Sequence, residues 1–517
     1  MEILACTIIG INIKNNKYLF KKRKIQIVCF FIIKIILLTI LIFFYFIFNF
    51  INKTKESEYY KHNENYNCYE DYKHNEDDKC KEDDKNCYEL DPINLFEKRL
   101  KNKPEAICKN GNSEHICYIN NKGYYNNIFS HKNGVICTMK NIILDPSKSS
   151  QSGYTYKGPV DFQNLGFPIL SKGFFNMKCN NPEKLKNTNK NYDRYFNSWN
   201  YEYNYENEKI EELSPGKTIF FISRNQDSPN LFHGNSEIVN AISMMYLFNL
   251  KPENIQVIFL ESMTINNDPF YDIYKNIISR GGEPIYIKNL KNKYLISSGI
   301  HIPLNWDSPC YLKLEFPKCK YPSKTYKIYN NLVDKYMNIS KFTDSFISDN
   351  ETFYYPKSII DNHELKMNFN KVVTIQWRKI WPKGRLNQYR LLGNAKELAN
   401  KLASFLPKNF LIRLVDTASL PMKEQITIMR NTDYLVGIHG AGLSLSIFMP
   451  YKSIFHEILP KQIMKVLRVM SAVSGQITYS DIIKSETKII DSNEYIFFNA
   501  NDFCNKVLEH LKETNLI

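Results

Sequence analysis

The sequence predicts an α/β protein with parallel sheets, preceded by one transmembrane helix. Between residues 371 and 460 apolar strand patterns alternate regularly with amphipathic helix patterns. Two more apolar runs, TIFFIS and IQVIFLE, repeat the pattern earlier in the chain, and a long apolar segment lies near the N-terminus. Strand and helix in alternation at this spacing predict parallel βαβ units.

The alternating region begins with VVTIQW, which we interpret as a buried strand, followed by NAKELANKLASFL as a helix. FLIRLVDT is the next predicted strand, and SLPMKEQITIMRN is the next predicted helix. In that helix we expect Ser419 to be the N-cap and Pro421 to lie in the first turn. Ligands of such sheets bind beyond the carboxyl ends of the strands.

The most informative segment is YLVGIHGAGLSLSIFMPYKSIFHEILP, residues 434–460. An apolar strand enters the bend Gly437-Ile438-His439-Gly440-Ala441-Gly442, a short helix follows, and a second strand ends near Glu457. Glycines let the backbone approach a ligand and present N–H groups at a helix start, which suits a diphosphate. Glu457 could accept hydrogen bonds from ribose hydroxyls. The glycine order is not G-x-G-x-x-G, so a nicotinamide site is disfavoured.

A basic loop, QWRKIWPKGRLNQYRLLGN, joins the first strand and helix of this region. Arginines at the end of a strand suit bidentate phosphate binding. The alternative is a solvated basic loop. Its basic residues, interleaved with Trp377 and Trp381, are Arg378, Lys379, Lys383, Arg385 and Arg390.

These residues carry a resemblance to glycosyltransferase family 61. It rests on Arg378-x6-Arg385-Leu386-Asn387, on EQITIMRNTDYLVGIHGAGLSLSIFMP and on FHEILP, with weaker blocks at residues 136–144, 230–242 and 259–274. The resemblance covers roughly residues 105–510. It implies an inverting enzyme that uses a nucleotide sugar and has the GT-B fold, in which two Rossmann-like halves face a cleft.

The resemblance also implies a donor pocket, in which arginines and helix amides meet the charge of the departing nucleoside diphosphate. No metal ligands are implied and no metal is obligatory, while use of a divalent ion stays open. UDP-xylose or UDP-N-acetylglucosamine is the expected donor. The donor-binding residues are Arg378, Arg385, Asn387, His439, Gly440, Ala441, Gly442, Leu443 and Glu457.

An inverting transfer needs a general base for the acceptor hydroxyl. His233 and Glu237 are four residues apart at a predicted helix start, so they share one face. Glu261 and Asp268, at the end of a strand and in the next loop, are rival bases. The structural alternatives are local packing for His233, a surface position for Glu237 and a turn start for Asp268.

Residues 27–48 are almost wholly apolar, interrupted by Lys34, and are long enough to cross a bilayer. Lysines and Arg23 precede them and acidic residues follow, so the positive-inside tendency places the N-terminus in the cytosol. We expect a type II Golgi membrane protein with a lumenal catalytic part. The endoplasmic reticulum is the alternative, although no KDEL-like signal ends the chain.

The predicted organisation is a cytosolic tail (1–24), a transmembrane signal anchor (25–51), a flexible acidic stem (52–100), an acceptor-side half (101–356) and a donor-side half (357–517). Most of the 12 cysteines lie beyond the anchor, so disulfides are expected, with Cys310–Cys319 or Cys108–Cys117 as short loops. Sequons at Asn52, Asn338 and Asn350 permit glycosylation.

The net charge is +15 and the isoelectric point about 9.0. Lysine is spread along the chain and no nucleic-acid motif occurs, so nucleic acid is not an expected partner. The expected partners are a nucleotide sugar, a glycan or glycoprotein acceptor, and the membrane. The alternative function is an inactive membrane-anchored protein of the same fold that binds nucleotides or glycans. A hydrolase is disfavoured because the sequence carries neither a nucleophile elbow nor a metal-ligand set.

Overall fold

The computed structural model describes residues 91–517 except 103–104, 120–134, 152–167, 180–194, 205–207, 224–229, 261–267, 304–318, 320–321, 340–350, 355–369, 379–389, 408 and 460–465. The predicted tail, anchor and most of the predicted stem therefore lie outside the described residues. Within the described ranges, no helix combines the length and apolar character needed to span a bilayer.

The first sheet is mixed and has the order β1-β2-β3-β12-β9-β10-β11. Its first strands are antiparallel, whereas β12, β9, β10 and β11 are parallel. Three short strands, β6, β7 and β8, pair at its margins, and β4 pairs with β5 separately. The strands are β1 (Glu105–Asn110), β2 (Ser113–Ile119), β3 (Val135–Leu144), β4 (Ser149–Gln151), β5 (Pro168–Leu170), β6 (Phe175–Asn176), β7 (Trp199–Asn200), β8 (Glu211–Glu212), β9 (Thr218–Ile222), β10 (Ile255–Phe259), β11 (Ile285–Tyr286) and β12 (Tyr294–His301).

Helical segments connect or cover this sheet. The α-helices are α5 (Pro92–Leu100), α7 (Leu231–Leu247), α8 (Tyr271–Ile273) and α9 (Lys324–Tyr336). The π-helix η5 (Tyr274–Ile278) continues α8, and the 3₁₀ turns are η1 (Pro146–Lys148), η3 (Pro252–Asn254) and η6 (Ile287–Asn289). The predicted strands TIFFIS and IQVIFLE correspond to β9 and β10, and α7 crosses between them.

The second sheet has the order β13-β16-β14-β17-β18-β19, and every pair except β13–β16 is parallel. Its elements are β13 (Glu351–Tyr354), β14 (Lys371–Gln376), α11 (Ala395–Phe405), β16 (Phe410–Val415), η9 (Thr417–Ser419), α12 (Met422–Arg430), β17 (Tyr434–Ile438), η10 (Ala441–Phe448), β18 (Ile454–Ile458), α13 (Val466–Val473), β19 (Ile477–Asp481) and α14 (Ala500–Glu513). A small sheet beside it contains β15 (Leu391–Leu392), β20 (Ser485–Ile490) and β21 (Asn493–Phe498).

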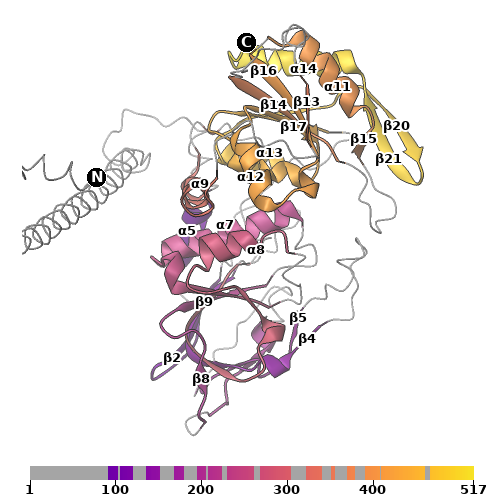
Figure 1. Ribbon diagram of the computed structural model, residues 1–517. Coiled ribbons are helices and arrows are strands. Elements are labelled where there is room, and N and C mark those ends of the chain that lie inside the picture. Colours follow the sequence, from indigo (N-terminus) through magenta and orange to yellow (C-terminus); the bar gives the residue numbers. More distant parts are fainter. Residues whose placement is uncertain are drawn as a thin grey trace, which may run out of the picture. The chain divides into compact units, whose positions relative to one another are not determined.

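The second sheet is a three-layer structure: α11 and α14 cover one face of its strands, and α12 and α13 cover the other (Figure 1). Successive strand residues alternate between these faces. On β17, Tyr434 and Val436 join the α11/α14 core, while Leu435 joins a core that also includes residues of α7, α9 and η10. The predicted α/β class is confirmed.

Three details correct the sequence predictions. Residues 92–100 were assigned to a flexible stem, but they form α5, whose Phe96 is fully buried against α7. β13, placed before the predicted border at 356, pairs with β16, so the second sheet begins earlier than predicted. Ser419 ends the turn η9, and Pro421 takes the N-cap position of α12.

The described disulfides also differ from the predicted Cys108–Cys117 loop. Cys117 pairs with Cys137, and Cys108 pairs with Cys179. The strand register explains the correction, because Cys117 and Cys137 stand directly opposite each other on β2 and β3. Cys319 is disulfide-bonded too, and its predicted partner Cys310 lies outside the described residues.

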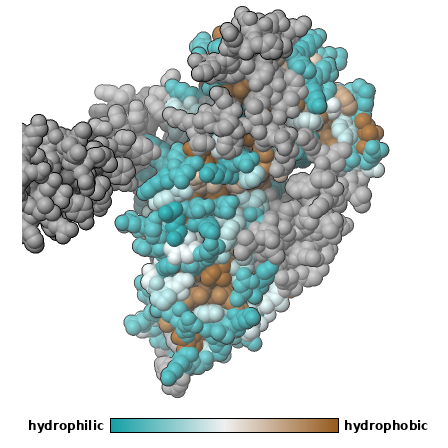
Figure 2. Space-filling view, in the orientation of Figure 1, coloured by the Kyte–Doolittle hydropathy of each residue, from teal (hydrophilic) through white to brown (hydrophobic). Residues whose placement is uncertain are grey.

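On the face shown in Figure 2 the described surface is mainly hydrophilic, with a hydrophobic group in the lower part of the view and a smaller one over the β20–β21 hairpin. Exposed isoleucines account for the smaller group: Ile489 is 68% and Ile490 is 44% accessible. Both lie at the outer end of β20, far along the chain from the glycine bend.

Candidate functional site

The parallel strands of the second sheet end along one edge, where their last or next-to-last residues stand side by side. Val415, Gln376, Gly437, Glu457 and Ser480 are consecutive partners across β16, β14, β17, β18 and β19. The glycine bend and the start of the basic loop leave the sheet just beyond this row. The structure therefore brings both predicted ligand-binding segments to the same edge, as parallel strands require.

The bend passes directly into η10, and Gly440 occupies its N-cap position. The first turn is closed by a hydrogen bond of 3.0 Å from the Leu443 N–H to the Gly440 carbonyl. The N–H groups of Ala441 and Gly442 come before any acceptor within that helix. This geometry supports the predicted anion-binding character of the bend.

The Arg378 guanidinium lies against Gly440. A Cβ atom at Gly440 would stand 3.0 Å from Arg378 Nη2, so a glycine leaves room for the arginine. A Cβ at Gly442 would overlap the side-chain amide of Gln376, which donates a 2.6 Å hydrogen bond to Thr417 Oγ1. The glycines therefore allow the side chains of the β14 carboxyl end to reach the bend.

His439 and Glu457 form a close pair. His439 Nδ1 lies 2.5 Å from Glu457 Oε1, and the Glu457 side chain is fully buried while 14% of the His439 side chain is exposed. The second carboxylate oxygen of Glu457 accepts a 3.4 Å hydrogen bond from Ser480. Both oxygens of Glu457 are thus held by protein groups, and the predicted contact with a ribose stays a prediction.

Arg468, on α13, is a further cation near this pair. Burial lowers the pKa of its guanidinium, and the nearby carboxylates of Glu457 and Asp481 act in the opposite direction. Its Nε donates a 3.1 Å hydrogen bond to Thr478. Arg468 was not predicted, because nothing in its local sequence sets it apart from a surface arginine.

The predicted base candidates on α7 have different surroundings. Asn230 caps the helix by accepting from the Phe232 N–H at 3.0 Å. His233 is half-buried beside the Phe232 ring, whereas Glu237 is 1% exposed. The surface alternative is therefore wrong for Glu237. Ile238, Ile242 and Met245 point inward as predicted.

Helix α7 also touches the element that carries the glycine bend. Asn235 donates a 3.3 Å hydrogen bond to Ser444 of η10, and Tyr329 of α9 donates to Asn235 at the same distance. Neither Asn235 nor Ser444 was predicted, although Asn235 is fully buried between two positions that were. His233 and Glu237 therefore lie on a helix that packs against the candidate donor site.

Asp268 is committed to local structure. Its Oδ1 accepts from the Phe270 N–H at 2.9 Å, and its Oδ2 accepts from the Tyr286 hydroxyl at 2.9 Å. Its carbonyl accepts from the Tyr271 N–H, which closes a turn. The structure thus has the turn start that the sequence left open as an alternative, and a role for Asp268 as base stays a prediction. The remaining predicted site residues, Arg385, Asn387 and Glu261, lie outside the described residues.

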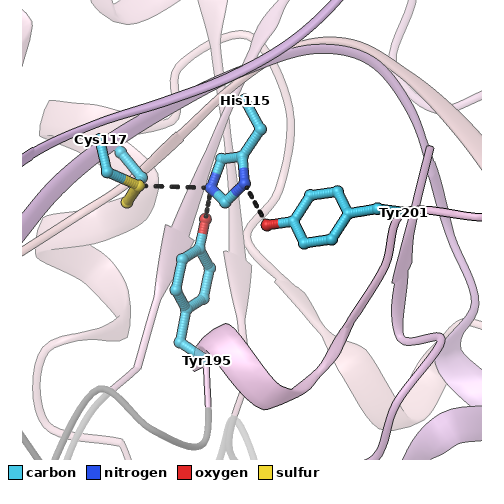
Figure 3. The surroundings of a disulfide bond; sticks show 5 residues. His115, Cys117, Tyr195 and Tyr201 are labelled. Atoms are coloured by element: carbon cyan, nitrogen blue, oxygen red, sulfur yellow. Dashed lines mark hydrogen bonds between the residues drawn. A yellow bond between two sulfur atoms is a disulfide. The ribbon is translucent and has the colours of Figure 1, made fainter. Parts of the chain in front are cut away.

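A second group of reactive side chains surrounds a disulfide of the first sheet (Figure 3). His115 Nδ1 lies 3.0 Å from the Tyr201 hydroxyl, and its Nε2 lies 3.1 Å from the Tyr195 hydroxyl and 3.4 Å from Cys117 Sγ. Burial lowers the pKa of His115, so the ring is neutral. Because Cys117 is joined to Cys137, no thiolate is available and this cluster is structural.

Comparison with known proteins identifies the class of this fold and site. Residues 293–455, from β12 to β18, match the family described as Glycosyltransferase 61. The protein is therefore a glycosyltransferase. The match supports glycosyltransferase family 61 and confirms the resemblance predicted from the bend and the basic loop. The upstream blocks of that resemblance lie outside the matched range. No curated protein matches the chain.

Proposed function

We propose that this glycosyltransferase moves one sugar, with inversion, from UDP-xylose or UDP-N-acetylglucosamine to a hydroxyl of a glycan or glycoprotein. We further propose a GT-B arrangement, in which the first sheet supplies the acceptor side and the second sheet the donor side. The observation that carries the proposal is the approach of Arg378 to Gly440, at the edge where the family match ends in β18.

In this proposal the donor diphosphate lies between the Arg378 guanidinium and the N–H groups of Ala441 and Gly442. Sugar transfer releases a nucleoside diphosphate, so negative charge grows on the phosphate oxygens as the glycosidic bond breaks. Fixed N–H donors and a guanidinium stabilise this charge most where water is scarce. These groups supply the stabilisation without an obligatory metal at the donor site.

Glu457 acts on His439 as a positioning residue. A buried carboxylate that accepts from Nδ1–H fixes both the ring orientation and the tautomer, and leaves Nε2 for a ligand. In this arrangement His439 Nε2 lies beside the phosphates. His439 then contacts the donor directly, and the predicted contribution of Glu457 is made through His439.

The acceptor base is proposed to come from α7, because that helix touches η10 through Asn235 and Ser444. His233, which is half-buried, is a better candidate than Glu237, because a base must reach the acceptor hydroxyl. Glu237 would then shape the charge around the helix. Glu261 stays a rival.

The proposed compartment is the Golgi lumen, reached by a single-pass type II anchor at residues 25–51, with the endoplasmic reticulum as alternative. Disulfides in the first sheet fit an oxidising compartment. Protease protection of the C-terminal part in sealed membranes, lost after detergent, tests this topology. Digestion of that part before detergent would contradict it.

The activity is tested by incubating the purified full-length chain with radiolabelled UDP and GDP sugars. We expect hydrolysis or transfer from one UDP sugar, with product of inverted anomeric configuration by NMR. Tight nucleotide binding by calorimetry without turnover would instead favour an inactive binding protein. H233A should abolish transfer and keep UDP binding, and unchanged transfer in H233A would remove His233 as the base.

A further inference from the structure

A buried cluster on the α14 side of the second sheet joins four elements. His456 lies on β18, Asp481 ends β19, His510 is near the end of α14, and Tyr434 begins β17. His456 and Tyr434 are fully buried and His510 is 3% exposed, while 23% of the Asp481 side chain is exposed. None of these side chains is needed for the proposed transfer.

The two imidazoles converge on one carboxylate oxygen. His456 Nε2 and His510 Nε2 each lie 3.1 Å from Asp481 Oδ2, and one ligand atom from each residue falls within 4.8 Å of the others. The distances alone would allow hydrogen bonds. The directions do not, because neither His456 Nε2 nor Asp481 Oδ2 has a hydrogen bond of acceptable angle in the described structure.

Three ligand atoms that converge at this spacing, without being aligned for hydrogen bonds to one another, form the arrangement that a shared cation requires. In a tetrahedral zinc site the ligand atoms are about 2.0–2.2 Å from the metal, which places them about 3.3 Å apart. Two imidazole nitrogens and one carboxylate oxygen are a common zinc ligand set, with solvent in the fourth position. The partial exposure of Asp481 leaves an approach for that solvent molecule.

We propose that His456, Asp481 and His510 bind one divalent transition-metal ion, of which Zn²⁺ fits the ligand set best. The site lies outside the predicted donor pocket. Its three ligands come from β18, β19 and α14, and no local sequence motif connects them.

Tyr434 supplies the outer contacts that such a site needs. Its hydroxyl oxygen lies 2.9 Å from Nδ1 of His456 and 2.9 Å from Nδ1 of His510. A neutral imidazole that binds metal through Nε2 carries its proton on Nδ1, and the tyrosine oxygen can accept two such protons. Without a metal, the single hydroxyl proton serves only one ring, so the other ring must donate Nδ1–H. The ring that donates Nδ1–H then has two alternatives. It carries a second proton on Nε2 and is a buried imidazolium, or its Nε2 is unprotonated and faces the Asp481 carboxylate.

The charges around the cluster allow a cation. Lys506 of α14 interacts with His456 and Asp481, and its ammonium pairs with Glu509 at 2.8 Å. Glu513 accepts from Tyr479, whose ring stacks on His510 at 3.7 Å. The acids of α14 therefore offset the lysine on that helix, and Arg468 of α13 is a further cation near Asp481.

The bound ion would fasten the C-terminal helix to the strands that carry the donor site. His456 precedes Glu457 on β18, so the two side chains point to opposite faces of the sheet. A metal on one face would therefore hold β18 to α14 without contacting the proposed donor site on the other face.

The test uses the purified full-length chain, stripped with a chelator and titrated with Co²⁺ and then Zn²⁺. We expect one equivalent of Co²⁺, visible d–d absorption of a four-coordinate nitrogen and oxygen site, and no thiolate charge-transfer band from Cys504. Zn²⁺ should displace the Co²⁺. D481N and H510Q should abolish stoichiometric binding, and Y434F should weaken it by about 10–100-fold.

E509Q is the matched control, since it removes one carboxylate from the same helix without touching a proposed ligand. It should bind as the unmodified chain does. Should D481N or H510Q not fold, the unmodified chain still decides, because the chelator must lower its melting temperature and Zn²⁺ must restore it. Failure to bind Co²⁺ or Zn²⁺ stoichiometrically, or equal binding by E509Q and a folded D481N, would overturn the proposal.

Discussion

The two faces of β18 carry the same chemical pair in different settings. Glu457 faces the bend and holds His439, and His456 faces α14 and approaches Asp481. On the first face the imidazole is 14% exposed and belongs to the residue before Gly440, which Arg378 approaches. On the second face both imidazoles are enclosed and share Tyr434. The pairing of histidine with carboxylate is thus not itself informative, because what surrounds the pair decides whether it serves a ligand or the fold.

The largest expected effect comes from Arg378. R378A removes the charge that faces the proposed diphosphate, so we expect turnover to fall by about 10²–10³-fold in steady-state kinetics. R280A is the control, since Arg280 pairs with Glu253 in the first half of the chain and should leave turnover unchanged. Equal activity of R378A and the unmodified enzyme would contradict the proposal that the donor binds at the face of β18 that carries Glu457.

Glu457 tests whether His439 must be held. E457L leaves His439 Nδ1 without its acceptor, at a cost of about 1–3 kcal/mol, which corresponds to about 5–150-fold in kcat/KM. E457Q keeps an acceptor oxygen and should recover part of the activity. A purely structural role would instead lower the melting temperature of E457L and leave its kcat/KM intact.

His301 is a buried histidine without a nearby carboxylate, and it makes the stability of the fold depend on pH. Burial lowers the pKa of His301 to about 3, below the ordinary unfolded value of about 6.5. The unfolded state therefore takes up the proton first, and stability is lost as the pH falls from about 6.5 towards 3. At pH 5, His301 lowers the free energy of unfolding by about 2 kcal/mol.

Denaturant unfolding at pH 7 and pH 5 measures this loss. H301Q should show a smaller fall between the two pH values by about that amount. His115 and His456 have pKa values lowered by burial as well, so some acid sensitivity will persist in H301Q. An identical fall in H301Q and the unmodified chain would mean that His301 is protonated or exposed in solution.

The smallest effect is expected at Tyr434. Y434F leaves two imidazole nitrogens without the hydroxyl, and we expect the free energy of unfolding to fall by about 1–2 kcal/mol. The KM for the donor should not change, since this face does not touch the donor. Y479F, which loses only the bond to Glu513 near the surface, is the control. A raised KM in Y434F would show that the two faces are not independent.

Much of the second sheet could be predicted from the sequence. VVTIQW, FLIRLVDT and the strand before the bend are continuous apolar runs, and they became β14, β16 and β17. Periodicity does not reveal pairing partners, so it missed that β13 joins this sheet. It also assigned α5 to the stem, because a short helix among acidic residues becomes recognisable only through the buried Phe96.

The parts of the candidate site that lie within a single segment of the chain could be predicted from the sequence. The bend and Arg378 were found because glycines before a helix start and an arginine at a strand end both suit anion binding, and both lie at one edge. Gln376, Thr417, Asn235 and Arg468 were missed because their residue types are ordinary for their positions. Their importance comes from neighbours that are distant in the chain.

By itself, the sequence determined the alternation of strands and helices, the glycine bend and the family, because these depend on local pattern and residue type. Only the tertiary structure decided which carboxylate meets which imidazole, which cysteines pair, and that His456, Asp481 and His510 converge. Such contacts depend on strand register and on the packing of α14, and a shift of one residue along β18 would exchange its two faces.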